Sequence, residues 1–225
     1  IFSHAGFQDA ADGASHQALS YFSMTHSIPN VETYCLSCST EAEQLLSQVI
    51  DKFAKDRQEG RVPKTSIFFL GRENFPRYVK EEKETYELGK ATIAFDSSGD
   101  FDISTTIAAS GPMLFQALEA AENLKEQKHG AIVVNPSTIN KCDVESFRSA
   151  LAKTNGRLLT VEDHQKVGGM GAQLTHSLAL NKVKFDLVGS LGVDRKFGQS
   201  AYTANQLYAK HGLDSEAIVK ACTTN

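Results

Sequence analysis

The stretch GPMLFQALEAAENLKEQKHGAIVVNP, residues 111–136, decides the fold. An apolar stripe at helical spacing predicts a helix over residues 111–128; its members are Leu114, Ala117, Leu118, Ala121 and Leu124. Gly130 can adopt the left-handed conformation that ends such a helix. The apolar run AIVVN then predicts a buried strand that stops before Pro136. A helix leading directly into a fully apolar strand is typical of a parallel sheet covered by helices on both faces.

The same alternation of strands and helices extends in both directions. The sequences ATIAF and ISTTIAA flank DSSGDFD, which has the composition of a hairpin or a longer loop. Asp143 is a predicted N-cap. The further predicted elements towards the C-terminus are a helix over 144–154, a strand over 157–161, a helix over 169–180, a strand over 185–189 and two short helices within 201–222.

The first part of the chain repeats the pattern on a smaller scale. VETYC (31–35) and TSIFFL (65–70) are predicted strands, and Thr40 with Glu43 forms a potential capping box for a helix over 40–57. The polar segment that follows, with Pro76 inside it, is predicted to cross the surface without packing. We therefore expect an α/β protein with two α/β units, residues 1–86 and 87–225, each built on a mostly parallel sheet flanked by helices.

Composition excludes several classes of function. The chain has 225 residues, 41% of them hydrophobic, and a net charge of −4. No cluster of Lys and Arg forms a surface for nucleic acid, and no apolar run is long enough to span a membrane. The chain does not open with a signal-peptide pattern, so a cytoplasmic location is expected.

Three motifs have a structural and a functional interpretation. CLSC (35–38) is the one cysteine pair with familiar spacing, but a second pair of zinc ligands is missing, so small, partly buried thiols are expected. GGMG (168–171) does not have the spacing of a nucleotide-binding loop, which favours a close approach of a helix to the sheet. EDH (162–164) follows a predicted strand, where it is either part of a ligand site or a solvated loop.

The segment DGASHQALSYF (12–22) has the order expected of a site at the start of a helix. A glycine turn lies between Asp12 and His16, and the apolar residues behind them can anchor the backbone. HAG (4–6) lies a few residues upstream and supplies His4. These side chains are candidates for binding or proton transfer, although a histidine in such a place is also common as a cap.

The chain resembles the C-terminal portion of the transketolase family over its whole length. The family pattern T-H-D, G-E-D-G-P-T-H-Q-P and I-P-N is similar to SHA (3–5), DGASHQ (12–17) and IPN (28–30), with its spacing preserved. Further similar segments are LGRENFP (70–76), TVEDHQKVGGMG (160–171), VDRKFGQSA (193–201) and HGLDSEAI (211–218). The loop departs from the pattern at Ala11, Ala14 and Ser20, and CLSC replaces the family's R-P-A-D. These departures leave the donor and acceptor sugars open.

The resemblance implies roles for four residues around one cleft. His4 and Arg72 would bind the phosphate end of a sugar phosphate, Arg72 through its bidentate fork. His16 would assist proton transfer next to the transferred carbon, and Asp12 would hold the neighbouring hydroxyl. Without the resemblance, Arg72 could equally be part of a surface ion pair.

The resemblance also implies what lies outside this chain. Family members bind thiamine diphosphate and Mg²⁺ through earlier parts of the protein, so residues 1–86 correspond to the second half of a pyrimidine-binding domain. We expect no cofactor on this chain alone, no activity of the isolated chain, and a missing N-terminal portion or partner chain in a homodimeric enzyme. An apolar surface is expected near Ile1 and along residues 18–36. Deoxyxylulose-phosphate synthases, 2-oxoacid dehydrogenase β-subunits and a non-catalytic binding or regulatory module are the alternatives.

Overall fold

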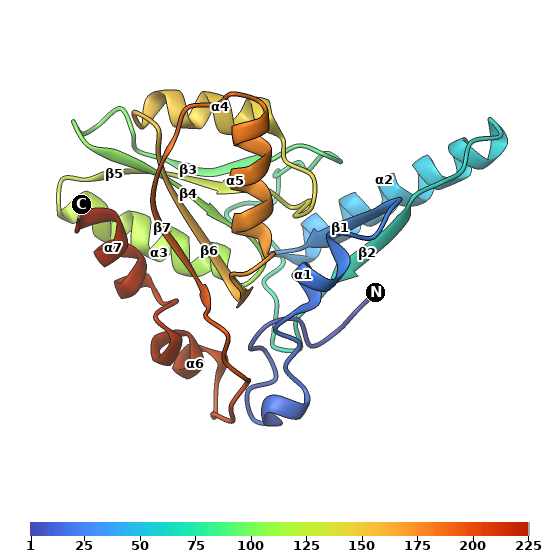
Figure 1. Cartoon of the computed structure of the whole chain (residues 1–225), viewed down its shortest axis with the longest axis horizontal. Helices are drawn as coiled ribbons and strands as arrows, with labels where there is room; N and C mark the ends of the chain where they lie inside the picture. Colours follow the sequence, from blue (N-terminus) through green and yellow to red (C-terminus); the bar gives the residue numbers. More distant parts are fainter. Residues whose placement is uncertain (225) are drawn as a thin grey trace.

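A five-stranded sheet forms the centre of the structure, a computed structural model that describes residues 1–224 (Figure 1). Its strand order is β3-β5-β4-β6-β7, and β4 to β7 are mutually parallel. The strand bounds are β3 (Thr92–Asp96), β4 (Ser104–Ala109), β5 (Gly130–Asn135), β6 (Arg157–Gln165) and β7 (Asp186–Val193). β3 is an antiparallel edge strand paired with β5, so the segment DSSGDFD is a longer connection and not the turn of a hairpin. The prediction of a mostly parallel sheet flanked by helices is confirmed.

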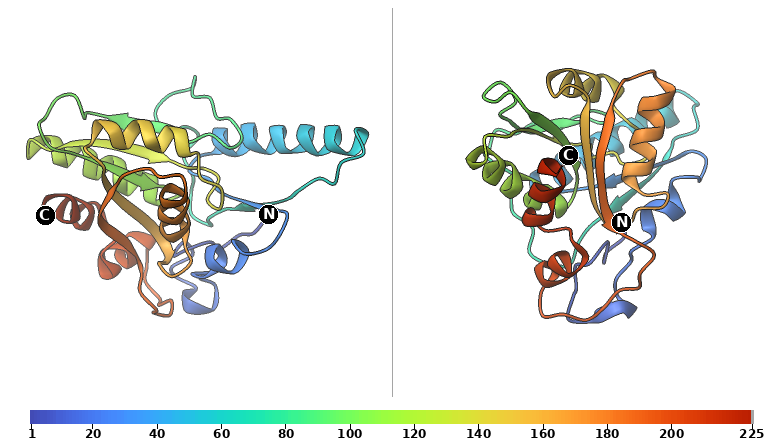
Figure 2. Two further views of the ribbon diagram at one scale, coloured as in Figure 1. Left: turned by 45° about the horizontal axis from the view of Figure 1, so that its top comes forward. Right: turned by 60° about the vertical axis from the view of Figure 1, so that its left-hand side comes forward.

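Helices cover both faces of this sheet (Figures 1 and 2). α3 (Met113–Glu126), α6 (Ala204–His211) and α7 (Ser215–Thr223) pack on one face, and α4 (Val144–Lys153) and α5 (Met170–Leu180) pack on the other. The chain moves from β4 to β5 in one direction across the sheet, and from β5 to β6 and β7 in the opposite direction. Because α3 lies on the face opposite α4 and α5, all three crossovers have the same hand, as the general rule requires.

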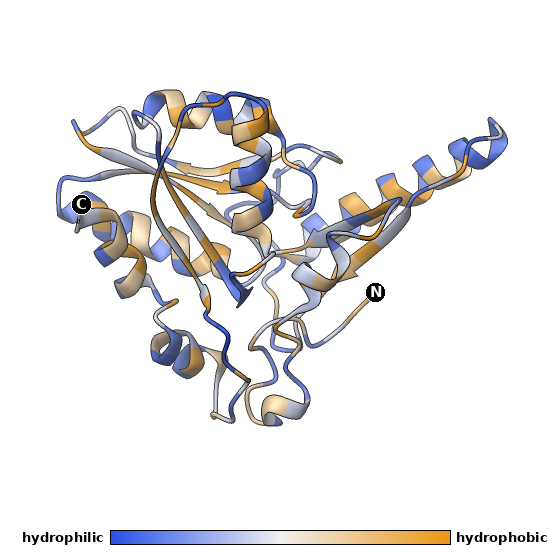
Figure 3. Cartoon of the chain, in the orientation of Figure 1, coloured by the Kyte–Doolittle hydropathy of each residue, from blue (hydrophilic) through white to orange (hydrophobic). Residues whose placement is uncertain are grey.

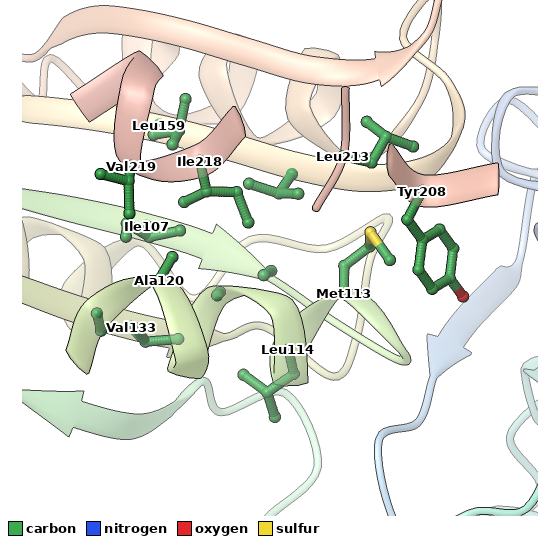
Figure 4. Close-up of a cluster of buried hydrophobic side chains, with 14 of the residues drawn as sticks. Ile107, Met113, Leu114, Ala120, Val133, Leu159, Tyr208, Leu213, Ile218 and Val219 are labelled. Carbon is green, nitrogen blue, oxygen red and sulfur yellow. The ribbon is translucent and has the colours of Figure 1, made fainter. Parts of the chain in front are cut away.

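Successive residues of the central strands fill two separate cores. Ile107 and Val133 pack with α3 and α7, whereas Ala108 and Val134 point to α4 and α5. Figure 4 shows part of the first core, where Ala120 of α3 faces Ile218 and Val219 of α7, and Leu114 packs on the other side of α3. This alternation is the pattern of strands buried on both faces, which explains their uninterrupted apolar sequence.

The first part of the chain forms a smaller unit beside the sheet. β1 (Val31–Cys35) and β2 (Thr65–Phe69) are parallel, and the 20-residue α2 (Ser39–Gln58) connects them. The short α1 (Tyr21–Thr25) and the 3₁₀ turn η1 (Gly13–Ser15) precede them. Residues 70–91 contain neither helix nor strand, as predicted, but the segment does pack, because Tyr86 is buried in an apolar cluster with Leu45 of α2. A division of the chain at residues 86 and 87 stays a prediction.

α2 projects away from the rest of the structure and carries an apolar stripe along its length (Figures 2 and 3). Ile50 is 58% exposed and Phe53 is 52% exposed. The predicted apolar surface near the N-terminus is present at Ile1 and Phe2, but between residues 18 and 36 it is limited to Met24 and Ile28. Leu19, Phe22 and Cys35 of that segment are instead buried in the cores of the larger sheet, and Tyr34 and Leu36 are buried in a cluster with Leu45 of α2.

Three local predictions are corrected by the structure. The cap of α2 is Cys38, whose Sγ accepts a hydrogen bond from the Glu41 N–H, so no capping box forms at Thr40. The left-handed residue after α3 is Lys128, because Gly130 already begins β5. The EDH segment lies inside β6 and is fully buried, so it is not a solvated loop.

Candidate functional site

The predicted site lies on a loop that runs along the carboxyl end of β6. The carbonyl of Leu19 accepts a hydrogen bond from the N–H of Gln165, the last residue of β6, at 2.7 Å. In Figure 1 this loop, at the start of the chain, lies beyond the arrowhead of β6. The carboxyl ends of parallel strands are the usual place of ligand sites in α/β proteins.

His4 and Arg72 lie in direct contact although 68 positions separate them. Arg72 donates a hydrogen bond from Nη1 to Nε2 of His4 at 3.0 Å, and the hydroxyl of Ser3 lies 2.6 Å from His4 Nδ1. The parallel pairing of Phe2 with β2 accounts for the contact, because it places the chain start beside the end of β2, from which Arg72 follows. The structure therefore joins the two residues assigned to one end of the substrate.

His16 lies next to this pair, and Asp12 does not contact it. The rings of His4 and His16 have centroids 5.6 Å apart, and His16 Nδ1 lies 3.0 Å from the Ser15 hydroxyl. Asp12 is exposed at the start of η1, and among residues 1–224 its carboxylate forms no hydrogen bond or ion pair with His4, His16 or Arg72. A groove of about 590 Å³ adjoins the same turn, but its walls contain Ala14 and Gln17 and none of the four predicted residues.

The structure adds Asp9, which the sequence analysis missed. Its Oδ2 lies 3.2 Å from His4 Nε2 and 3.6 Å from Arg72 Nη1. Asp9 sits between the two motifs used for the prediction, and its φ of 70° has no distinctive sequence signal. The proximity of HAG and DGASH in the chain was the one available hint that this intervening segment would line the site.

Asp163 on β6 fixes the loop that contains His4 and Asp9. Its Oδ2 accepts a hydrogen bond from the Phe7 N–H at 3.3 Å, and its Oδ1 lies 2.9 Å from Nδ1 of His164. Gly6 has φ 73°, and a side chain at that position would collide with the Asp163 carboxylate. A glycine is thus required where the loop passes over the strand.

Glu162 caps the helix that follows β6. Its two carboxylate oxygens accept hydrogen bonds from the N–H groups of Met170 at 2.7 Å and Gly171 at 3.0 Å. A side chain on Gly169 or Gly171 would meet Glu162 or Thr160, which confirms that the glycines of GGMG allow a close approach to the sheet. Burial raises the pKa of Glu162 to about 8 against the two hydrogen bonds, which lower it.

The four cysteines are free thiols, and both members of CLSC are buried. Burial raises the pKa of Cys35 well above its usual range. Within residues 1–224, no group of three or more His, Cys, Asp and Glu side chains is placed to hold a metal ion. In the same range no helix combines the length and apolar composition needed to cross a membrane.

Comparison with known proteins identifies the family. Residues 102–218 match the family described as transketolase, C-terminal domain. The chain belongs to the transketolase family. It is 30% identical over 220 residues to a protein of Methanocaldococcus jannaschii described as a transketolase C-terminal section, covering 98% of this chain and 63% of that protein.

A second relative and a solved structure are also described as transketolases. The chain is 27% identical to one of the subunits of the apulose-4-phosphate transketolase of Phocaeicola vulgatus, covering 96% of this chain and 62% of that subunit. A solved structure titled split gene transketolase, inactive beta4 tetramer, superposes with a TM-score of 0.78 at 24% identity, covering 99% of this chain and 64% of that chain. The chain thus spans less than two thirds of the length of these relatives, and the last comparison establishes the fold alone.

Proposed function

We propose that this chain is the C-terminal part of a transketolase that transfers two-carbon ketol units between sugar phosphates, as in the pentose phosphate pathway. The contact of His4 with Arg72, with His16 beside them, is the observation that carries the proposal. It brings cationic and proton-transferring groups to one place at the carboxyl end of β6. Such convergence of side chains from distant segments is what a binding site for a polar substrate requires.

Each residue has a separate task in this proposal. His4 and Arg72 hold the end of the sugar that is remote from the reacting carbon, and Arg72 can present two parallel N–H groups to a phosphate. His16 is exposed and free to exchange a proton with the hydroxyl next to the transferred carbon. Asp12, exposed on the same loop, orients the neighbouring hydroxyl.

Thiamine diphosphate and Mg²⁺ would supply the carbanion chemistry in the complete enzyme. The described part of this chain does not fit a metal-bound diphosphate, because it lacks a metal-binding group of side chains. The proposal therefore places the cofactor and the metal in the parts of the complete enzyme outside this chain, and it assigns no catalytic activity to the chain alone.

Exposed apolar residues provide a surface for the part of the enzyme that would hold the cofactor. Ile1, Met24 and Ile28 are exposed near the site loop, and Ile50 and Phe53 are exposed along α2. The two relatives described as a section and as a subunit of a transketolase support a partner chain that carries the missing portion and covers these residues, within a homodimer of complete enzymes. Apolar patches of this kind mark protein interfaces.

The test combines the purified chain with thiamine diphosphate, Mg²⁺, xylulose 5-phosphate and ribose 5-phosphate. The upstream-extended protein, or the chain mixed with its upstream partner, is assayed in parallel. We expect turnover only in the second case. Comparable turnover by the short chain would contradict the division, and no turnover by the extended protein with any sugar pair would contradict the transketolase assignment.

A further inference from the structure

Asp9 brings a negative charge into the cation pair that the proposed function assigns to a phosphate. Its side chain is 13% exposed, compared with 24% for His4 and 51% for Arg72. A carboxylate at 3.2 Å and 3.6 Å from these two groups competes with any anion for the same cations. The unliganded site therefore already contains an internal counter-ion.

The hydrogen bonds of the three groups cannot all be satisfied among themselves. When His4 is neutral with its proton on Nδ1, Nε2 accepts from Arg72, and the buried Asp9 Oδ2 has no hydrogen-bond donor within residues 1–224. When His4 is doubly protonated, Nε2–H can serve Asp9, but then two cations meet at 3.0 Å. In the first state a buried carboxylate oxygen lacks a donor, and a ligand hydroxyl that enters between it and the exposed Arg72 side chain can supply one.

The backbone holds Asp9 in this position. His4 and Asp9 both have left-handed conformations, with φ of 61° and 70°, which are uncommon for residues other than glycine. The carbonyl of Asp9 accepts a hydrogen bond from the N–H of Asp12 at 3.2 Å, and Asp163 anchors the loop at Phe7. Strained conformations fixed from both sides are typical of binding sites.

The chemistry of the ligand follows from the unsatisfied oxygen. A sugar hydroxyl can donate to Asp9 Oδ2 and accept from Arg72 in the same position. A phosphate dianion offers acceptors only, so it gains the contact with Arg72 but meets the Asp9 carboxylate with like charge. Asp9 therefore weakens phosphate binding and strengthens the binding of a hydroxyl.

We infer that Asp9 determines substrate specificity at this end of the site, so that an unphosphorylated polyol end binds about as well as a phosphorylated one. The inference rests on the proposed function, because it requires His4 and Arg72 to contact the sugar. It adds a residue that sets the preference between the two classes of sugar.

The test measures binding to the full chain by NMR titration of backbone amides at low ionic strength, with ribose, ribose 5-phosphate and inorganic phosphate as probes. The wild type should bind ribose and ribose 5-phosphate with dissociation constants within about threefold of each other. Asp9→Asn removes the charge at constant shape and should tighten ribose 5-phosphate and phosphate about tenfold, without tightening ribose. Asp9→Gly is the second variant, because glycine suits the φ of 70° and also removes the charge.

Two control variants separate the outcomes. Asp51→Asn makes the same change of net charge on an exposed residue of α2, and Arg72→Ala removes the proposed anion contact. If Arg72→Ala weakens phosphate binding but neither Asp9 variant strengthens it, the role of Asp9 is wrong and the proposed site stands. An equal gain from Asp51→Asn also overturns the inference, since the effect would then be one of net charge. If Arg72→Ala changes nothing, the proposed substrate site fails and the inference fails with it.

Discussion

The buried cap formed by Glu162 predicts an unusual decline of stability with pH. Burial raises the pKa of this carboxyl to about 8, while in the unfolded chain it titrates near 4.5. The folded state therefore binds a proton that the unfolded state releases, so its contribution is full below pH 4.5 and is lost as the pH rises through 8. His26 has the opposite effect, because burial lowers its pKa from 6.5 to about 4 and stability rises with pH across that interval.

Between pH 6.5 and 8, the comparison of the wild type with a Glu162 variant isolates this carboxyl. His26, His129 and His211 act in the opposite sense there, because burial lowers the pKa of each and the unfolded imidazoles still lose protons above pH 6.5, and these contributions are common to both proteins. Integration over the Glu162 proton between these limits gives a loss of about 1.5–2 kcal/mol in the contribution of this one group to the free energy of unfolding. Glu162→Gln lacks this contribution, so the wild type should lose about 1.5–2 kcal/mol relative to the variant across the same interval. At pH 6.5 the variant should be about 1–3 kcal/mol less stable, because one helix N–H faces an amide donor.

Urea denaturation at four pH values between 6.5 and 8 measures both slopes in the same buffers. The groups that face Glu162 are Asp163 on β6 and the N-terminus of α5, and the variant leaves both unchanged. A wild type that gains stability relative to the variant as the pH rises through this interval would refute the reasoning. So would a Glu162→Gln variant that declines as steeply as the wild type, because the decline would then come from another group.

Three further changes have expected outcomes. Glu41→Ala leaves the buried donors of Ser37, Asn135 and Ser137 without their acceptor and should lower the free energy of unfolding by about 3–6 kcal/mol, measured in urea; a loss below about 1 kcal/mol would contradict this. Leu124→Ala opens a cavity in the core under α3 and should cost about 2–5 kcal/mol in the same assay, whereas an unchanged midpoint would contradict close packing there. His16→Ala in the complete enzyme should lower kcat/KM about a hundredfold through kcat, since proton transfer is lost, and an effect confined to KM would argue against that role.

The larger sheet was predictable because each of its signals is local. Continuous apolar strands and one-sided helices such as that of Leu114 and Leu124 specify buried elements without reference to distant residues. The antiparallel pairing of β3 was not predictable in this way, because nothing in ATIAF indicates with which strand it pairs. The cap of α2 was missed because Cys38 is a rare cap, and the expected Thr40 and Glu43 lie inside the first turns of the helix.

The sequence indicated candidate residues of the site more readily than it indicated which of them contact one another. Spacing and resemblance selected His4, His16 and Arg72, which lie together, and also Asp12, which forms no hydrogen bond or ion pair with them among the described residues. Asp9 was not predicted from the sequence, because its position depends on a left-handed backbone and on a contact with Arg72, which is distant in the sequence. Such contacts arise from tertiary packing, which a single sequence does not display.

The topology of the larger sheet explains why the site lies outside it. The direction of the connections reverses around β4, and in open α/β sheets the crevice beyond the strand ends at such a reversal is the usual ligand site. Here the chain's own N-terminal segment is anchored at the carboxyl end of β6: the ring of Phe22 stacks on His164 with centroids 3.5 Å apart, and the N–H of Phe7 binds Asp163. The sheet thus uses its carboxyl edge to fix the loop from His4 to Asp9, and the candidate side chains His4, His16 and Arg72 lie beyond this loop. Rigid support behind a strained loop is what keeps its side chains in place, and the buried EDH segment supplies that support through the hydrogen bond of Asp163 to the Phe7 backbone.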